Sequence, residues 1–291
     1  MQRIFASAAV LSVIALGITG CSTPAPVSSP TATQALEVNH QARAFLPAAI
    51  KSSGVLRVAS DLTYPPNEFT NANKEAVGWE IDLIRKVADR LGLNVKVINT
   101  HFADIFPTLN GKNADVGLSS FFDTAERRKL VDMVDYYQAG TKWAALRGSN
   151  LDPSNACGYS IAVQENTYQS DVDLPARSLA CQKQNRKPIE ILGLNTQDEA
   201  TEAVMLGQAK AFVADSPVTD FAVMRSSGKL KTVGDVYDTS FYGMPVAKGS
   251  SLGKALEMAI QDLMNKDVYR EVLSSWGVTD GAIGNARLNG Q

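Results

Sequence analysis

The sequence predicts an α/β protein of two lobes, each built around a central mixed sheet, with the lobes joined by a two-stranded hinge. Three observations predict this fold class. From residue 54 onward, strand-like and helix-like segments alternate, which is typical of mostly parallel sheets covered by helices. Two stretches, LNGKNADVGLSS at 109–120 and LGQAKAFVADS at 206–216, each pass from a helix end through a turn to a buried strand with a polar tip. The 291 residues also suffice for two domains of ordinary size.

The first lobe is expected to begin with a buried strand at 55–60. A helix should follow over 79–91, because its apolar residues recur at helical spacing and Gly92 is a typical stop signal. The remaining elements are a strand at 94–100, a short helix ending at Gly111 and a strand at 114–120.

The second lobe repeats the alternation. Thr196 and Glu199 have the spacing of a capping box, so a helix should begin after Thr196 and end near Gly207. Two further helices near 252–264 and 267–276 are expected to return to the first lobe. The strands of the second lobe are expected at 160–164, 188–194 and 209–215.

This arrangement makes the chain cross twice between the lobes, near 147–150 and near 241–246. The expected first lobe is 54–147 and 243–280, the second lobe is 148–242, and 281–291 form a C-terminal tail.

The N-terminal segment has the features of an export signal. Arg3 precedes an apolar run from Ile4 to Ile18, which is short for a membrane span, so residues 1–20 are interpreted as a signal peptide. The sequence ITGC that ends at Cys21 resembles the lipobox of bacterial lipoproteins, in which the Cys carries the lipid. The alternative is an ordinary signal peptide with a Cys there by chance. A Ser/Thr/Pro-rich stretch follows, so 21–53 are interpreted as a lipidated Cys and a flexible linker. The protein would then be extracytoplasmic and anchored to the cell membrane.

The remaining composition excludes several classes of protein. Cys157 and Cys181 are left as one pair in an oxidising compartment, which favours a disulfide over two free thiols. His40 and His101 are the only histidines and lack ligand spacing, so no metal and no cofactor is expected. The formal net charge of −2, without a basic block, makes nucleic acid an unexpected partner.

The polar strand tips indicate where a ligand would bind. Ligands of open α/β sheets lie beyond the carboxyl ends of the strands, and clefts between lobes favour small ligands. Ser119 and Ser120 follow one strand, and Asp215 ends another.

The stretch SSFFDTAERRK, residues 119–129, contains a local contradiction. Asp123 and Glu126 have the spacing of a capping pair at a helix start, yet Arg127 and Arg128 follow at once. Cations are unfavourable near a helix N-terminus, whereas an anion bound there would be favourable. A bound carboxylate would therefore explain the arginines. From spacing alone, Arg127 could equally be a solvated surface cation.

Four segments together resemble a known family: DLTYPPNEF, GWEIDLIRKVADRLG, ADVGLSSFFDTAERRKLVDMVDYY and AFVADSPV. They are similar to the extracytoplasmic solute-binding proteins of ABC importers, in the polar amino acid-binding branch with the type II periplasmic-binding fold. The resemblance runs from about Val55 to Trp276.

The resemblance implies a role for each matching residue. Arg127 would bind the α-carboxylate of a free amino acid, Asp215 would accept its α-ammonium group, and Thr167 would add a second carboxylate contact. Ser119, Ser120 and the N–H of Phe122 would line the same pocket. Tyr64 and Phe102 would cover the ligand side chain.

The residues that would contact the ligand side chain depart from the family pattern, so the resemblance leaves the identity of the amino acid open. Asp61, Asn67 and Asn166 are the candidates for this subsite. Asp61 and Glu68 could recognise a cationic side chain, with turn-forming and surface roles as equal alternatives.

The function implied is a monomeric, lipid-anchored receptor that delivers a polar amino acid to an ABC transporter permease. One alternative is a dehydratase-like enzyme on the same fold, with Glu165 as the only suspected acid or base. Another is a ligand-sensing domain. Because no catalytic arrangement is visible in the sequence, we expect the protein not to be an enzyme.

Overall fold

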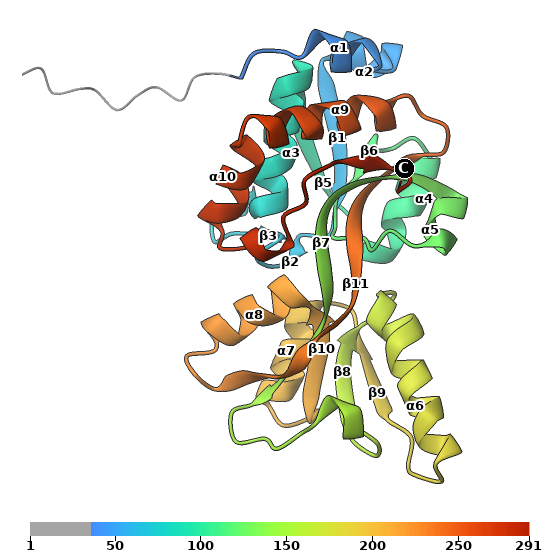
Figure 1. Ribbon diagram of the computed structural model, residues 1–291, viewed down its shortest axis with the longest axis vertical. Coiled ribbons are helices and arrows are strands. Elements are labelled where there is room, and N and C mark those ends of the chain that lie inside the picture. The colour runs from blue at the N-terminus through green and yellow to red at the C-terminus, as the bar shows by residue number, and fades with distance from the viewer. Residues whose placement is uncertain (1–35, 291) are drawn as a thin grey trace, which may run out of the picture. The chain divides into compact units, whose positions relative to one another are not determined.

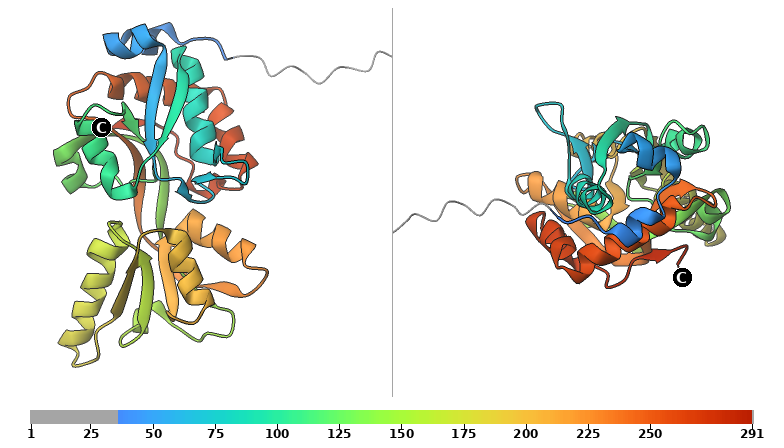
Figure 2. Two further views of the ribbon diagram at one scale, coloured as in Figure 1. Left: turned by 180° about the vertical axis from the view of Figure 1, so that it is seen from behind. Right: turned by 90° about the horizontal axis from the view of Figure 1, so that it is seen from above.

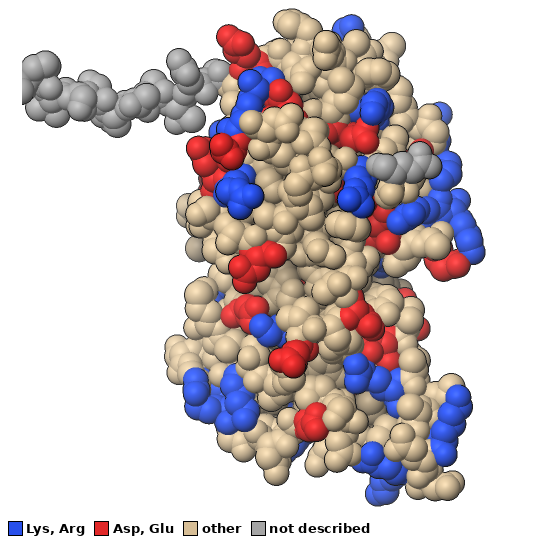
Figure 3. All heavy atoms as spheres, in the orientation of Figure 1, with Lys and Arg blue, Asp and Glu red and all other residues tan. Residues whose placement is uncertain are grey.

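The computed structural model describes residues 36–290. The expected signal peptide, Cys21 and the linker as far as residue 35 lie outside the described residues, so their predicted roles remain predictions. Among the helices of the described part, none has both the length and the apolar character that crossing a bilayer requires. Lys and Arg occur together with Asp and Glu on both lobes of the face shown in Figure 3.

Two long antiparallel strands connect the lobes of residues 36–290 (Figures 1 and 2). They are β7 (Val131–Leu146) and β11 (Leu230–Ala247). The hydrogen-bonded strand order is β5-β1-β6-β11-β7-β10-β8-β9, so the two long strands belong to the sheet of both lobes. Parallel and antiparallel pairs both occur, which confirms the predicted mixed α/β fold.

The core of the first lobe includes the apolar face of the predicted helix after Gly78. This helix, α3, ends at Gly92, which has the left-handed backbone (φ 64°) that glycine adopts easily. Its apolar face is fully buried, together with Trp79. The C-terminal helices pack on the same core, as predicted. The elements of this lobe are α1 (His40–Ala44), α2 (Ala48–Ser53), β1 (Val55–Ser60), β2 (Thr63–Tyr64), β3 (Glu68–Thr70), β4 (Ala76–Val77), α3 (Trp79–Leu91), β5 (Asn94–Asn99), η1 (Phe102–Asp104), α4 (Ile105–Asn110), β6 (Val116–Gly117), α5 (Ala125–Leu130), α9 (Leu252–Asn265), α10 (Val268–Ser275), η4 (Thr279–Gly281) and β12 (Arg287–Leu288).

The second lobe has the predicted three-strand core with helices on both sides (Figure 1). The capping box is present, because Thr196 and Glu199 exchange side chain to backbone hydrogen bonds at the start of α7. Cys157 and Cys181 form a disulfide, which confirms that prediction. The elements of this lobe are η2 (Pro153–Asn155), β8 (Ser160–Gln164), η3 (Gln169–Asp173), α6 (Leu174–Lys183), β9 (Glu190–Leu194), α7 (Gln197–Met205), β10 (Ala211–Asp215) and α8 (Ser216–Arg225).

Part of the expected linker is folded. Residues 40–44 and 48–53 form α1 and α2, and the side chains of Ala42, Leu46 and Ile50 are buried in the core of the first lobe. The prediction of a flexible linker was therefore wrong for these residues. Helices of five and six residues are too short to be stable alone, so packing on the lobe holds them.

The first crossing lies earlier than predicted. β7 already pairs with β10 of the second lobe from Thr141 to Ala145, so residues 147–150 lie at the far end of that lobe. On β11, Val246 pairs with β6 and so belongs to the first lobe. The C-terminal residues return to β7, where Arg287 pairs with Asp135. Because β7 is one unbroken strand, no break in its sequence marks the crossing.

Candidate binding site

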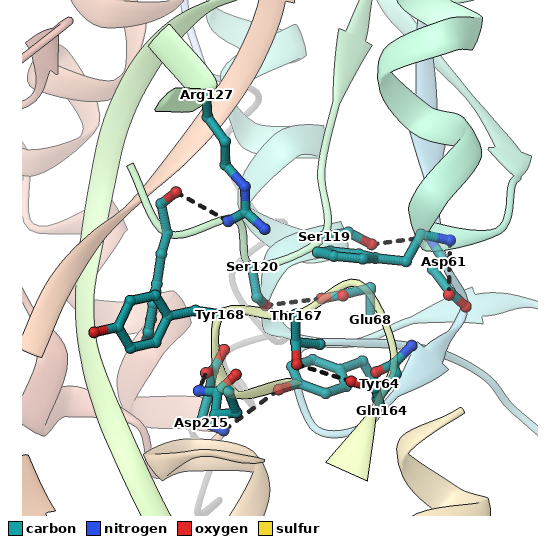
Figure 4. A pocket seen from close by; sticks show the side chains of 13 residues that line it. Asp61, Tyr64, Glu68, Ser119, Ser120, Arg127, Gln164, Thr167, Tyr168 and Asp215 are labelled. Atoms are coloured by element: carbon teal, nitrogen blue, oxygen red, sulfur yellow. Dashed lines mark hydrogen bonds between the residues drawn. The ribbon is translucent and has the colours of Figure 1, made fainter. Parts of the chain in front are cut away.

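A polar pocket lies between the two lobes (Figure 4). About 370 Å³ of space lies between its side chains, counting the part open to solvent. From the first lobe it is lined by Asp61, Tyr64, Glu68, Phe102, Ser119, Ser120, Phe122 and Arg127. From the second lobe it is lined by Gln164, Thr167, Tyr168, Gln169 and Asp215.

The start of α5 explains how Arg127 reaches the pocket. Thr124 is the N-cap and its side chain accepts a hydrogen bond from the Arg127 amide at 3.2 Å. The predicted capping pair of Asp123 and Glu126 was wrong, because Asp123 instead pairs with Arg128 at 2.7 Å. Adjacent residues on a helix point in different directions. Arg127 therefore turns into the pocket while Arg128 is held on the other side by Asp123.

The guanidinium of Arg127 is held by a carbonyl group and two aromatic rings. Its Nη1 donates to the carbonyl oxygen of Phe122 at 3.0 Å. The guanidinium carbon lies 5.2 Å from the ring centre of Phe121 and 5.7 Å from that of Phe102, within cation–π range. Burial lowers the pKa of Arg127, but arginine still keeps its charge. Within residues 36–290, one of its five N–H groups has a partner, so the others can bind an anion.

Asp215 provides the opposite charge from the second lobe (Figure 4). It ends β10, as the strand-tip argument predicts, and is buried. Gln169 Nε2 donates to its Oδ1 at 2.7 Å and the Tyr242 hydroxyl donates to its Oδ2 at 2.7 Å. Burial raises the pKa of Asp215 to about 6, although these hydrogen bonds oppose the shift. Its side chain makes no capping hydrogen bond to α8, so support of that helix does not explain its position.

The two serines at the tip of β6 connect the pocket to the layer behind it. Ser119 Oγ accepts a hydrogen bond from the Asp61 amide at 2.9 Å. Ser120 has a left-handed backbone (φ 51°), which is uncommon for serine. In this conformation its hydroxyl donates to Glu80 Oε1 at 2.8 Å and its amide donates to Glu80 Oε2 at 3.3 Å.

Tyr64 and Thr167 line the pocket from opposite lobes. The hydroxyl of Tyr64 accepts a hydrogen bond from the Asp215 amide at 3.4 Å, and its ring packs with the apolar cluster of the second lobe. Thr167 donates to the carbonyl oxygen of Gln164 at 2.8 Å. Tyr64 thus connects the two lobes at the edge of the pocket.

The expected side-chain subsite is only partly present. Asp61 lines the pocket, where Thr63 and the Phe102 amide donate to its carboxylate at 2.7 and 3.0 Å. Asn67 does not line it, because its side chain is buried behind Ser120 and bonds to that hydroxyl at 2.7 Å. Asn166 is exposed in a turn with φ 62° and also lies outside the lining.

Several polar lining residues were not among the predicted contacts. Gln164 ends β8, so the strand-tip rule that indicates Asp215 could have found it. Tyr168 and Gln169 follow Thr167 directly, and no local pattern in the sequence separates them from surface residues. Glu80 lies behind the pocket and is fully buried in the first turn of α3.

The suspected enzymatic residue lies outside the pocket. Glu165 is exposed and is not among the lining residues. Among residues 36–290, no three His, Cys, Asp or Glu side chains are arranged to hold a metal ion.

Comparisons with known proteins agree with this architecture. Residues 56–279 match the family model of bacterial extracellular solute-binding proteins, family 3. The chain is 36% identical over 251 residues to the arginine-binding protein ArgT of Corynebacterium glutamicum, which covers 86% of this chain and 83% of that protein. It is 27% identical over 238 residues to the histidine-binding periplasmic protein of Salmonella typhimurium, which covers 76% of this chain and 86% of that protein. A solved ancestral arginine-binding protein bound to arginine superposes with a TM-score of 0.70 at 25% identity, over 77% of this chain and 98% of that one.

Two lobes, two connecting strands and a polar pocket between them define a type II solute-binding fold. The chain belongs to the bacterial extracellular solute-binding proteins, family 3. This confirms the family resemblance. It also agrees with the prediction that the protein is not an enzyme, since the relatives compared are named as binding proteins.

Proposed function

We propose that this protein binds a free cationic amino acid, with arginine as the first candidate. The pocket places the guanidinium of Arg127 in one lobe and the carboxylate of Asp215 in the other. A zwitterion has both charges a few ångströms apart, so it can bridge these two groups and hold the lobes together. Charge-assisted hydrogen bonds contribute about 1.5–3 kcal/mol each, so a few of them account for a micromolar dissociation constant, about −8 kcal/mol.

The side chain of the ligand would meet the acidic residues of the first lobe. Glu68 and Asp61 both line the pocket, and Glu68 is fully buried. A buried carboxyl group facing a ligand favours a positively charged partner. The names of the relatives, which include an arginine-binding and a histidine-binding protein, support the same class of ligand. The observation that carries the proposal is the presence of two extra acidic groups beside the Arg127 and Asp215 pair.

Membership of the family supports a wider role in transport. A relative from Chlamydia trachomatis is named a probable ABC transporter arginine-binding protein, which supports delivery of the ligand to a permease of this type. We keep the predicted lipid on Cys21 and a monomeric receptor as parts of the same proposal. Replacing Cys21 by Ser should move the protein from the membrane fraction to the soluble fraction.

A thermal-shift screen against free amino acids tests the ligand class. Ligand at 100 times its dissociation constant adds about 2.7 kcal/mol of stability, which gives a clear rise in melting temperature. We expect arginine, lysine or histidine to give the largest shift. If no amino acid shifts the melting temperature, the proposal is wrong.

Adjacent arginines provide a matched pair of variants. Arg127→Ala should abolish the shift because it removes the pocket guanidinium. Arg128→Ala removes a guanidinium from the next residue, which pairs with Asp123 and does not line the pocket. It should lower the melting temperature without ligand but keep the shift with ligand. A full shift in the Arg127 variant would remove that residue from the site.

A further inference from the structure

Two buried carboxyl groups lie next to the same Ser120 hydroxyl on the first-lobe side of the pocket. Glu68 lies on β3 and Glu80 in the first turn of α3, and both are fully buried. Gly78 allows this approach, because a Cβ at its position would lie 2.1 Å from the carbonyl oxygen of Asn67. The Glu80 amide donates to the same oxygen at 3.0 Å. The backbone thus holds β3 directly against the start of the helix.

The hydrogen bonds of the pair are unequal. Glu80 accepts from the hydroxyls of Tyr136 and Ser120 at 2.6 and 2.8 Å. Glu68 makes a weaker contact, in which its Oε2 lies 3.4 Å from the Ser120 hydroxyl. Its Oε1 is buried and accepts from no donor within residues 36–290. Glu80 is therefore better stabilised as a carboxylate than Glu68, although burial raises the pKa of both groups.

The charge state of the pair follows from this difference. Burial raises the pKa of Glu68 well above its ordinary value, and the neighbouring charge of Glu80 raises it further. Two carboxylates side by side in a buried site repel each other, which favours the protonated form of one of them. Glu68 is the better place for that proton, since Glu80 already has two hydroxyl donors.

We propose that the Glu68 and Glu80 pair holds one proton in the ligand-free protein and releases it to solvent when a cationic ligand side chain reaches Glu68. The inference rests on the proposed function. Two neighbouring buried carboxylates repel each other, so one stays neutral until an opposite charge arrives. Glu68 lines the pocket and can touch that charge. Glu80 is not part of the lining and acts as a positioning residue that keeps the proton on Glu68.

The other titratable groups around the pair have separate roles. Tyr64 and Tyr136 stay neutral, because burial raises their pKa well above the ordinary value. Asp61 faces the pocket and burial raises its pKa, while two hydrogen-bond donors and nearby His101 favour its carboxylate form. The charge of Asp61 adds a smaller increase to the pKa of Glu68. The charged groups farther along the pocket are Arg127 and Asp215, which are assigned to the α-carboxylate and α-ammonium groups of every amino acid ligand.

The proposal gives the pocket a pH-dependent preference. A cationic ligand must displace the proton, so its affinity should rise by up to tenfold per pH unit while the pair is protonated. A neutral ligand of the same shape leaves the proton in place and can accept a hydrogen bond from the protonated Glu68. Selectivity for the cation should therefore increase with pH.

Calorimetry with arginine and citrulline tests this. Citrulline has the shape of arginine with a neutral urea group, and both carry the same α-carboxylate and α-ammonium groups. Titrations near pH 7 in buffers with different ionisation enthalpies give the number of protons released per ligand bound. Proton uptake or release at Asp215 occurs with both ligands and cancels in the difference. We expect arginine to release up to one proton more than citrulline. Equal numbers would overturn the inference.

Two variants locate the source of the proton. Glu80→Gln removes the neighbouring charge, so the pKa of Glu68 should fall and the excess release with arginine near pH 7 should be smaller than in the wild type. Asp61→Asn removes another pocket carboxylate and should keep the excess release. If the excess release persists in Glu80→Gln and is lost in Asp61→Asn, Asp61 is the source of the proton and the inference is wrong.

The wild-type comparison needs no buried substitution, so it decides the question even if Glu80→Gln fails to fold. Arginine binding without excess proton release would contradict only this inference. Absence of binding to any amino acid would contradict the proposed function as well.

Discussion

The hydroxyl of Tyr242 donates a hydrogen bond to Oδ2 of Asp215 at 2.7 Å, and it does so from one of the two strands that connect the lobes. Both side chains are buried. Asp215 is thus fixed to the crossing strand β11 as well as to its own lobe, where Gln169 holds its other oxygen. A ligand that binds Asp215 therefore contacts a group whose position depends on the hinge.

The first prediction concerns this bond. Tyr242→Phe removes a donor that holds down the pKa of Asp215, so that pKa should rise above its value of about 6. A hydrogen bond to a charged group contributes about 1.5–3 kcal/mol, so the affinity for arginine at neutral pH should fall at least about tenfold. Calorimetry measures this directly. Tyr237→Phe is the matched control, because Tyr237 donates to Asp173 and does not line the pocket. Unchanged affinity in the Tyr242 variant would exclude the proposed role of the bond.

The second prediction is a pH dependence of binding that every amino acid ligand shares. Asp215 must be ionised to accept an α-ammonium group, and burial raises its pKa to about 6. Citrulline affinity should therefore fall as pH falls through about 6, by about tenfold for each pH unit below it. The stability of the ligand-free protein changes in the opposite direction, because it falls as pH rises. A raised carboxyl pKa contributes stability at low pH that is lost as pH rises through about 6. Calorimetry and thermal unfolding at matched pH values check both signs, and Asp215→Asn should remove both effects.

The third prediction concerns a buried carboxyl on β7 that the proposed function does not use. Asp135 is fully buried, and neither of its oxygens accepts a hydrogen bond within residues 36–290. Burial and then the neighbouring Asp123 raise its pKa to about 8. Its contribution to the free energy of unfolding is present below about pH 4 and is lost as pH rises to about 8. Asp135→Asn should thus be more stable than the wild type above pH 8, by at least about 1.4 kcal/mol, the equivalent of one pKa unit.

Urea unfolding at acid and alkaline pH measures this difference. Asp132 on the same strand provides the control. Despite burial, hydrogen bonds from Lys248, the Gly249 amide and Asn289 lower its pKa. Asp132→Asn should therefore destabilise the protein at neutral pH. Equal effects of the two substitutions would contradict the assignment of Asp135 as protonated and Asp132 as ionised at neutral pH.

The fourth prediction concerns the disulfide between Cys157 and Cys181. It closes a loop with a sequence separation of 24, for which chain entropy gives about 3 kcal/mol of stabilisation. Both cysteines lie in the second lobe and neither lines the pocket. Replacing both by Ala should lower the free energy of unfolding by about that amount and leave arginine affinity unchanged. A large loss of affinity would show that the crosslink also shapes the pocket.

The strand and helix pattern was predictable where one local signal dominates. The capping box at Thr196 and the glycine stop at Gly92 form as expected, because both depend on neighbours in the sequence. At Asp123 two local signals competed. Thr124 is the N-cap of the helix, because Asp123 pairs with Arg128 instead. The helices of residues 40–53 were missed because their stability comes from packing on a core distant in sequence.

The residues of the candidate site also include some that local sequence signals predict and some that they do not. Asp215 follows from its place at a strand tip, and Arg127 from its conflict with a helix start. Gln169 and Glu80 could not be predicted in this way, because their hydrogen-bond partners, Asp215 and Ser120, lie 46 and 40 residues away in the sequence. Buried polar residues of this kind show no periodic pattern. Their roles depend on which donors and acceptors the folded chain brings to them.

A last consequence concerns a group of three aromatic rings contributed by both lobes. Phe69 on β3 lies 6.0 Å from the ring of Trp276 and 6.5 Å from that of Phe221 on α8 of the other lobe. Separation of the lobes would carry Phe221 away from this group and change the surroundings of the half-buried indole. The tryptophan fluorescence of the protein, to which Trp276 contributes, should therefore change when the lobes open and close, without any attached dye.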